Sequence, residues 1–202
     1  VEHPPQVKTL KAAVVDRREA MQLLMGYNSF NGYVWNKLFD LQLIRENDIR
    51  FHADYPACED TMFVGSYLYH CSRVCVTEEC LYCYRQVSGG ANRGRYSGRK
   101  AYDPKWMSVF EMTEYMADLY KDDAVTAACR LHEVREAGIV LRSMEAAGYH
   151  GADHARLKGI LRRGAGLFFR DENSGRSQKL SVLLSCISPK LELAVWKLRN
   201  RK

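Results

Sequence analysis

Residues 103–148 read DPKWMSVFEMTEYMADLYKDDAVTAACRLHEVREAGIVLRSMEAAG, and their pattern predicts a helical fold. Asp103 followed by Pro104 is typical of a helix start, because the aspartate caps the first turn and proline fits the first helical position. Apolar or small residues then recur at helical spacing: Trp106, Phe110, Ala117, Tyr120, Ala127, Leu131, Val134, Gly138 and Leu141. Gly148 and Gly151 predict the end of this helical region.

Working outward from this stretch, the same periodicity predicts further helices on both sides. Towards the C-terminus we expect helices over residues 157–168 and 180–198, the second one interrupted at Pro189. Towards the N-terminus we expect helices over 16–25, with Asp16 as the cap, and over 35–45 and 59–70. Residues 74–85 are rich in Val, Cys and Tyr and predict a strand, and residues 49–51 are a second short strand or an apolar link. The predicted fold is mainly α with a small β component (α+β).

The composition is that of an ordinary globular protein. The 202 residues are 47% hydrophobic and 27% charged, which excludes a disordered chain, a collagen-like chain and a coiled-coil rod. The glycine- and cation-rich stretch 88–100 has no residues for a core, so we place a domain boundary there. This predicts two regions, residues 1–100 and a helical domain over residues 101–202. Because the chain begins at Val1, we expect it to be a piece of a longer protein.

Positive charge is concentrated in the C-terminal quarter. Residues 150–202 hold twelve Lys or Arg against four Asp or Glu, while the whole chain has a formal net charge of only +6. Such a segment suits an anionic partner, namely nucleic acid, lipid head groups or a phosphate-linked substrate. No helix-turn-helix, zinc-finger or RNA-binding signature accompanies it, so we expect no nucleic-acid partner.

Cysteines and histidines leave one metal site as an alternative. Cys71, Cys75, Cys80 and Cys83 are four thiols within 13 residues and include one CxxC pair. Structural zinc sites usually pair two such knuckles across a longer gap, so reduced, buried thiols are the favoured interpretation. His150 and His154 are separated by Gly151 and a predicted helix break, and we expect surface histidines and no metal site.

Three segments between residues 32 and 85 are informative about function when taken together. They are GYVWNKLF at 32–39, IRF at 49–51 leading to CEDTMF at 58–63, and CLYCYR at 80–85. Their order and spacing resemble the C-terminal half of the catalytic domain of family-2 glycosyltransferases of the GT-A type. The likeness is greatest to bacterial enzymes that build capsular and other surface polysaccharides, and it covers roughly residues 16–90.

The resemblance implies an inverting sugar transfer from a nucleotide-sugar donor to a hydroxyl acceptor. Such a transfer needs a carboxylate that accepts the proton of the acceptor hydroxyl. By resemblance this general base is Asp60, with Glu59 orienting it or contacting the acceptor. The alternative is that both acids only favour the positive end of a helix.

The same resemblance implies contacts to the acceptor and to the donor diphosphate. Trp35 would stack on an acceptor sugar or, alternatively, anchor the core, and Asn36 and Lys37 would bind acceptor hydroxyls or phosphate, with a solvated surface role open for Lys37. Arg85, Arg93 and Arg95 would contact the diphosphate from a mobile loop, or belong to an unstructured basic loop. These residues, with Glu59 and Asp60, are the predicted site.

The chain also departs from the family pattern. It contains no Asp-x-Asp motif, no alternating βα stretch before residue 50 and no Gln-x-x-Arg-Trp signature. We therefore expect the acceptor-side half of a non-processive cytoplasmic enzyme, inactive alone, whose parent binds Mg or Mn and the nucleotide sugar elsewhere. The acceptor would be a saccharide or a lipid-linked sugar, with the basic C-terminal helices either contacting the inner face of the plasma membrane or packing back on the body. The alternatives are a helical binding module with a basic C-terminus and a small zinc protein.

Overall fold

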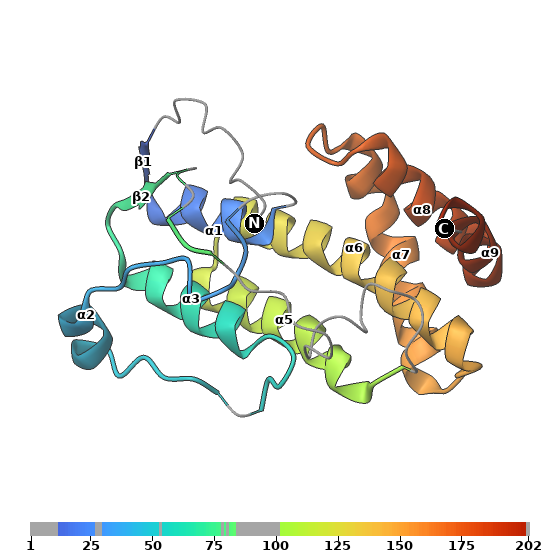
Figure 1. Ribbon diagram of the computed structural model, residues 1–202, viewed down its shortest axis with the longest axis horizontal. Coiled ribbons are helices and arrows are strands. Elements are labelled where there is room, and N and C mark those ends of the chain that lie inside the picture. Colours follow the sequence, from blue (N-terminus) through green and yellow to red (C-terminus); the bar gives the residue numbers. More distant parts are fainter. Residues whose placement is uncertain are drawn as a thin grey trace.

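The computed structural model describes residues 12–26, 30–52, 54–77, 79, 81–83 and 102–200 (Figure 1). Helices dominate it, and a two-stranded sheet lies at one end, so the predicted class, mainly α with a small β component, is confirmed. The elements in chain order are β1 (Ala13–Val15), α1 (Arg17–Met25), α2 (Leu41–Glu46), α3 (Glu59–His70), β2 (Val74–Val76), η1 (Pro104–Met107), α5 (Ser108–Tyr120), α6 (Asp123–Ala147), α7 (Ala152–Arg170), α8 (Arg176–Ile187) and α9 (Pro189–Arg199).

The predicted helix ends are confirmed where a local cap decides them. Asp16 accepts a hydrogen bond from the Glu19 amide at 2.9 Å and begins α1. Asp103 accepts from the Lys105 amide at 3.1 Å, and the turn it caps is the 3-10 helix η1. Gly148 ends α6 in the left-handed conformation, with φ 68°. Such ends depend on a few neighbouring residues only, which is why the sequence predicts them.

The sheet is smaller than predicted. β1 pairs antiparallel with β2 in the register Ala13↔Val76, Val14↔Cys75 and Val15↔Val74, so the strand predicted over 74–85 is wrong beyond residue 76 in the part that the structure describes. A strand extends only as far as its partner offers hydrogen bonds, and β1 is three residues long. Residues 49–51 form no strand, because the Ile49 amide closes the end of α2 by donating to the Ile44 carbonyl at 3.0 Å.

The helix predicted over 35–45 is also wrong in its first half. α2 begins only at Leu41, after Asp40, whose carboxylate accepts from the Gln42 amide at 2.8 Å. The side chain of Leu38 is fully exposed instead of lying on a buried helix face. Residues 30–40 form an irregular loop, here called the Trp35 loop, whose contacts are described below.

Helix α6 is the centre of the packing. It runs from α1 at one end of the molecule to α7 at the other (Figure 1), and it contacts α1, α5, α7, α8 and α9. One core cluster combines residues of β1, α1, α3, α5 and the first turns of α6, and a second combines η1, α5, α7 and α8 with the rest of α6. The first cluster therefore joins segments on both sides of residue 100, and the division of the sequence into two domains stays a prediction. In the described part of the chain, no helix combines the length and the apolar character that a membrane span requires.

Candidate functional site

The ammonium group of Lys37 holds the Trp35 loop in its irregular shape. Lys37 Nζ donates to the carbonyl oxygens of Phe30 (3.2 Å), Asn31 (2.7 Å) and Tyr33 (2.7 Å), and to Asn36 Oδ1 (2.8 Å). Hydrogen bonds from a charged donor are stronger than neutral ones, so four of them favour this loop over a helix. Lys37 is thus a positioning residue for the loop, and its predicted contact to an acceptor stays a prediction.

The Trp35 loop lies against the start of α3. A Cβ atom on Gly32 would overlap the side chain and Cα of Thr61, so only glycine permits this approach of the loop to the first turn of the helix. Burial lowers the pKa of Lys37 from 10.5 to about 8, and the negative charge of Asp60 opposes that shift. The predicted residues Lys37 and Asp60 therefore lie close enough for the charge of Asp60 to act on Lys37, and the nearest partners of the Lys37 ammonium are the oxygens of its own loop.

The two predicted carboxylates differ in their surroundings. Glu59 and Asp60 form the first turn of α3, whose N-cap, Cys58, makes no side-chain capping hydrogen bond. Glu59 is exposed, whereas Asp60 is half-buried. Neighbours on a helix point about 100° apart, so only one of the two faces the loop, and that one is Asp60.

Three aromatic side chains, two from the Trp35 loop and one from the third segment, form a stack. The ring of Trp35 lies 5.3 Å from that of Tyr33 at 19°, and 4.8 Å from that of Tyr82 at 31°. Tyr33 and Tyr82 are 38% and 56% exposed, so the stack presents aromatic faces to solvent. Tyr82 belongs to the third segment of the resemblance, and this contact joins that segment to the first.

A second aromatic group connects the middle segment to α3. Phe51 stacks on Phe63 at 4.4 Å, and Phe39 meets the edges of Phe63 and Tyr67 at 5.4 and 4.9 Å. The Tyr67 hydroxyl accepts from the Asp40 amide at 2.8 Å, at the end of the Trp35 loop. These contacts fix residues 39–51 on α3, next to the turn that carries Asp60.

The remaining predicted site residues are placed as follows. Asn36 lies on the exposed side of the Trp35 loop and donates through its side-chain amide to the Phe30 carbonyl at 3.1 Å. Arg85, Arg93 and Arg95, predicted to contact a diphosphate, lie outside the described residues. Of the four cysteines of the zinc alternative, Cys80 lies outside them too, and the others do not gather into a ligand group in the described segments.

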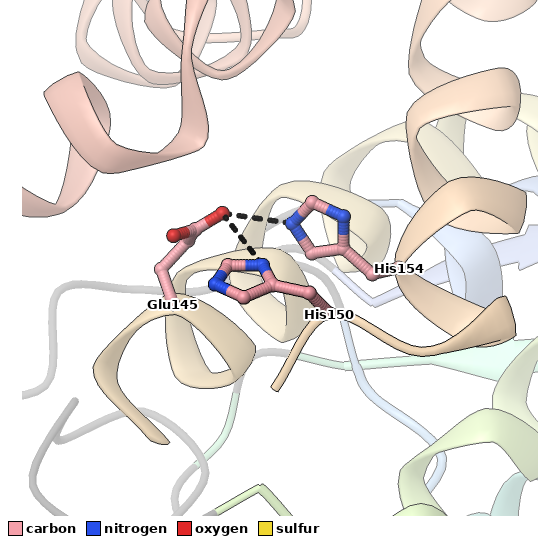
Figure 2. Close-up of side chains that lie close together, drawn as sticks. All are labelled: Glu145, His150 and His154. Carbon is pink, nitrogen blue, oxygen red and sulfur yellow. Dashed lines mark hydrogen bonds and ion pairs between the residues drawn. The ribbon is translucent and has the colours of Figure 1, made fainter. Parts of the chain in front are cut away.

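Two groups of polar residues were missed by the sequence analysis. Glu145, His150 and His154 gather where α6 ends and α7 begins (Figure 2), although we expected surface histidines there. The signal in the sequence was Glu145, an acidic residue that lies close before the two histidines, on the other side of Gly148. The side chain of His154 is only 13% exposed.

The second missed group is a buried ion pair, which no local pattern announces. Arg142 of α6 and Glu192 of α9 approach to 3.2 Å between Nε and Oε2, and both line a pocket of about 530 Å³ beside Trp196. The Ser181 hydroxyl donates to Glu192 Oε1 at 2.7 Å. This pair connects the central helix to the two C-terminal helices.

Comparison with known proteins gave no match to a family model, to a curated protein or to a solved structure.

Proposed function

We propose that this chain is the acceptor-side half of an inverting glycosyltransferase of surface-polysaccharide synthesis. The observation that carries the proposal is that the three family-like segments are joined by contacts, because the first packs on the start of α3 and the third packs on the first. Gly32 packs on Thr61, Lys37 interacts with Asp60, and Trp35 stacks on Tyr82, although these segments span some 50 residues of sequence.

In the proposed reaction, the Asp60 carboxylate accepts the proton of the acceptor hydroxyl as that oxygen forms a bond to the anomeric carbon. The bond from this carbon to the donor diphosphate breaks in the same displacement, and the nucleoside diphosphate leaves with the electron pair. A divalent metal, Mg or Mn, held with the donor in the remainder of the parent enzyme, would stabilise the charge on the leaving group. The described residues contribute the base and the acceptor surface.

The aromatic stack is the proposed acceptor platform. The C–H face of a pyranose packs on an indole or phenol ring, and the two tyrosines that flank the half-buried Trp35 in the stack, Tyr33 and Tyr82, are exposed to solvent. Lys37 supports the platform indirectly, because it holds the backbone that precedes Trp35 and the Asn36 side chain that follows it. Positioning of a reactant next to a catalytic group supplies a large part of enzymatic rate enhancement.

The test is Asp60→Asn in the full-length protein, assayed with UDP- and GDP-sugars and a bacterial lipid extract as acceptor. We expect transfer to fall by roughly 10²–10⁴-fold, the usual contribution of general-base catalysis, with donor binding unchanged. Asp54→Asn is the matched control, since Asp54 is an exposed carboxylate of the preceding segment. Transfer that persists in the Asp60 variant, or that falls equally in both, would remove Asp60 from this role.

A second candidate function, membrane docking, is favoured by the surface of α8 and α9. Five large apolar side chains are 43–67% exposed there: Leu180, Leu183, Ile187, Leu191 and Leu198. The same helices carry exposed cations: Arg176, Lys190, Lys197 and Arg199. An amphipathic basic surface of this kind binds anionic lipid, with about 1 kcal/mol for each cation near the membrane.

The docking proposal is tested with vesicles. We expect co-sedimentation with phosphatidylglycerol vesicles at low salt, less binding at high salt, and little binding to phosphatidylcholine. Ile187→Ser changes the most exposed of the five positions and should weaken binding. Leu38→Ser is the control and should not, because Leu38 is an exposed apolar residue of the Trp35 loop, outside α8 and α9. Binding that is absent, or indifferent to salt and to Ile187→Ser, contradicts the proposal.

A further inference from the structure

Three metal-ligating side chains lie together at the junction of α6 and α7 (Figure 2). Glu145 comes from the last turn of α6, His150 from the connecting turn and His154 from the first turn of α7. One ligand atom from each residue lies within 4.8 Å of the others. Glu145 Oε1 is 2.8 Å from His154 Nε2 and 3.9 Å from His150 Nδ1, so both imidazoles point a nitrogen at the same carboxylate oxygen.

The backbone of the connecting turn holds this arrangement in place. Gly148 adopts φ 68°, and the amides of Gly148 and Tyr149 donate to the Glu145 and Met144 carbonyls at 3.2 and 2.9 Å. The ring of Tyr149 lies 4.8 Å from that of Tyr102, whose hydroxyl donates to Asp153 at 2.9 Å. The turn is thus fixed at both ends, and the two histidines are positioned before any ligand binds.

Burial and charge favour a cation at this place. The side chain of Glu145 is 4% exposed and that of His154 is 13% exposed, whereas His150 is 49% exposed. A carboxylate removed from water requires hydrogen bonds or a compensating positive charge. A pocket of about 300 Å³, which two lysines, Lys158 and Lys190, also line, opens beside the three side chains and gives access from solvent.

We propose that Glu145, His150 and His154 bind a divalent transition metal of the zinc class. Two imidazole nitrogens and one carboxylate oxygen are the ligands that zinc takes in three-ligand protein sites, and such a set leaves one coordination position for water or a substrate atom. Imidazole nitrogen excludes Mg and Ca, which prefer oxygen ligands alone. The bound ion would cross-link α6 to α7. This proposal is independent of the proposed transferase function and of its donor-side metal.

The test is a titration of the metal-free protein with zinc chloride, followed by calorimetry and by thermal unfolding. We expect one zinc per chain and a higher midpoint of unfolding, because a ligand that binds only the folded state stabilises it. His150→Ala is the main variant, since its exposed side chain makes a folding defect the least expected of the three. We expect it to weaken zinc binding by roughly 10–100-fold or more, since even indirect partners of a metal site contribute that much.

The controls separate this site from other ligands of the chain. His70→Ala removes an exposed histidine at the end of α3 and should leave zinc affinity unchanged. Cobalt replaces zinc as a spectroscopic probe, and near-ultraviolet charge-transfer absorption would identify cysteine thiolate ligands. Glu145→Gln keeps the size of the side chain, removes its charge and should also weaken binding. The proposal is overturned by absence of zinc binding, by equal affinity in His150→Ala and the wild type, or by thiolate absorption at one equivalent of cobalt.

Discussion

The substitution Arg142→Met tests how much the buried ion pair between α6 and α9 contributes to stability. The side chains of Arg142 and Glu192 are 13% and 4% exposed. Their Nε and Oε2 atoms lie 3.2 Å apart without forming an aligned hydrogen bond. Burial raises the pKa of the Glu192 carboxyl, and burial lowers the pKa of the Arg142 guanidinium, in each case against the attraction of the partner. Desolvation therefore outweighs attraction for both groups.

The expected cost follows from the group that is left behind. Arg142→Met leaves the Glu192 carboxylate buried without a cation, and breaking a buried pair in this way costs about 3–5 kcal/mol of unfolding free energy. The Ser181 hydroxyl still donates to Glu192, and methionine keeps much of the packing on Trp196, so we expect the lower end, about 3 kcal/mol. For a chain of this length that lowers the melting temperature by roughly 6–12 °C.

The pH dependence gives the sharper readout. The pKa of Glu192 in the folded state lies above its ordinary value of 4.5, so the folded state keeps its proton to a higher pH than the unfolded state. Stability is therefore lost as the pH rises from 4.5 through the folded pKa, and it is regained as the pH falls. The cost of Arg142→Met should shrink between pH 7 and pH 5, because the stranded carboxylate becomes neutral.

The assay is urea unfolding of the wild type, of Arg142→Met and of the double variant Arg142→Met/Glu192→Leu at both pH values. We expect the double variant to equal or exceed the wild type, since apolar pairs often replace buried ion pairs without loss. A cost of Arg142→Met below about 1 kcal/mol, which is the range of exposed ion pairs, would refute the reasoning. A cost that is the same at pH 5 and pH 7 would refute it as well.

Two further predictions concern α7 and the Trp35 loop. Gly164→Ala would place a methyl group on the side chain of Val134 between α6 and α7, so we expect a loss of about 1–3 kcal/mol in unfolding free energy, restored in part by Val134→Ala. Gly166→Ala, which meets no neighbouring atom on the same helix, is the control and should stabilise by about 0.5–1 kcal/mol; equal effects of the two alanines would contradict the packing. For Lys37, burial lowers the folded pKa from 10.5 to about 8, so between these values the unfolded state binds more protons and the stability that Lys37 contributes rises with pH. The difference in unfolding free energy between the wild type and Lys37→Met should increase from pH 7.5 to pH 10, and a constant or decreasing difference would show that the ammonium is not buried as described.

The helix ends were predicted correctly because each depends on a short stretch of sequence. Asp16, Asp103 and Gly148 act on backbone groups a few residues away, and each begins or ends a helix where the sequence predicts it. Pro189 likewise marks the break between α8 and α9, as the first residue of α9 after the cap Ser188. The mainly α class follows from these local signals and from the periodicity of the apolar residues.

The predicted site is a mixed case. The resemblance to family-2 glycosyltransferases singled out Lys37 and Asp60, and in the structure the charge of Asp60 acts on Lys37. The sequence did not predict that the Lys37 ammonium group would bind carbonyl groups of its own loop. The spacing of residues 35–45 favoured a helix, in which those carbonyl groups would not surround one side chain. The catalytic role of Asp60 stays a prediction.

Local patterns in the sequence were enough to predict the class of the fold and most of the helix ends. Only the tertiary structure decided the length of β2, the shape of the Trp35 loop, the buried pair of Arg142 and Glu192, and the meeting of Glu145 with His150 and His154. The physical reason is the distance along the sequence over which each feature is determined. A cap or a periodic face is decided by neighbours within two turns of helix, whereas a strand partner, a buried counter-charge or a ligand set comes from other elements and exists only once these have packed.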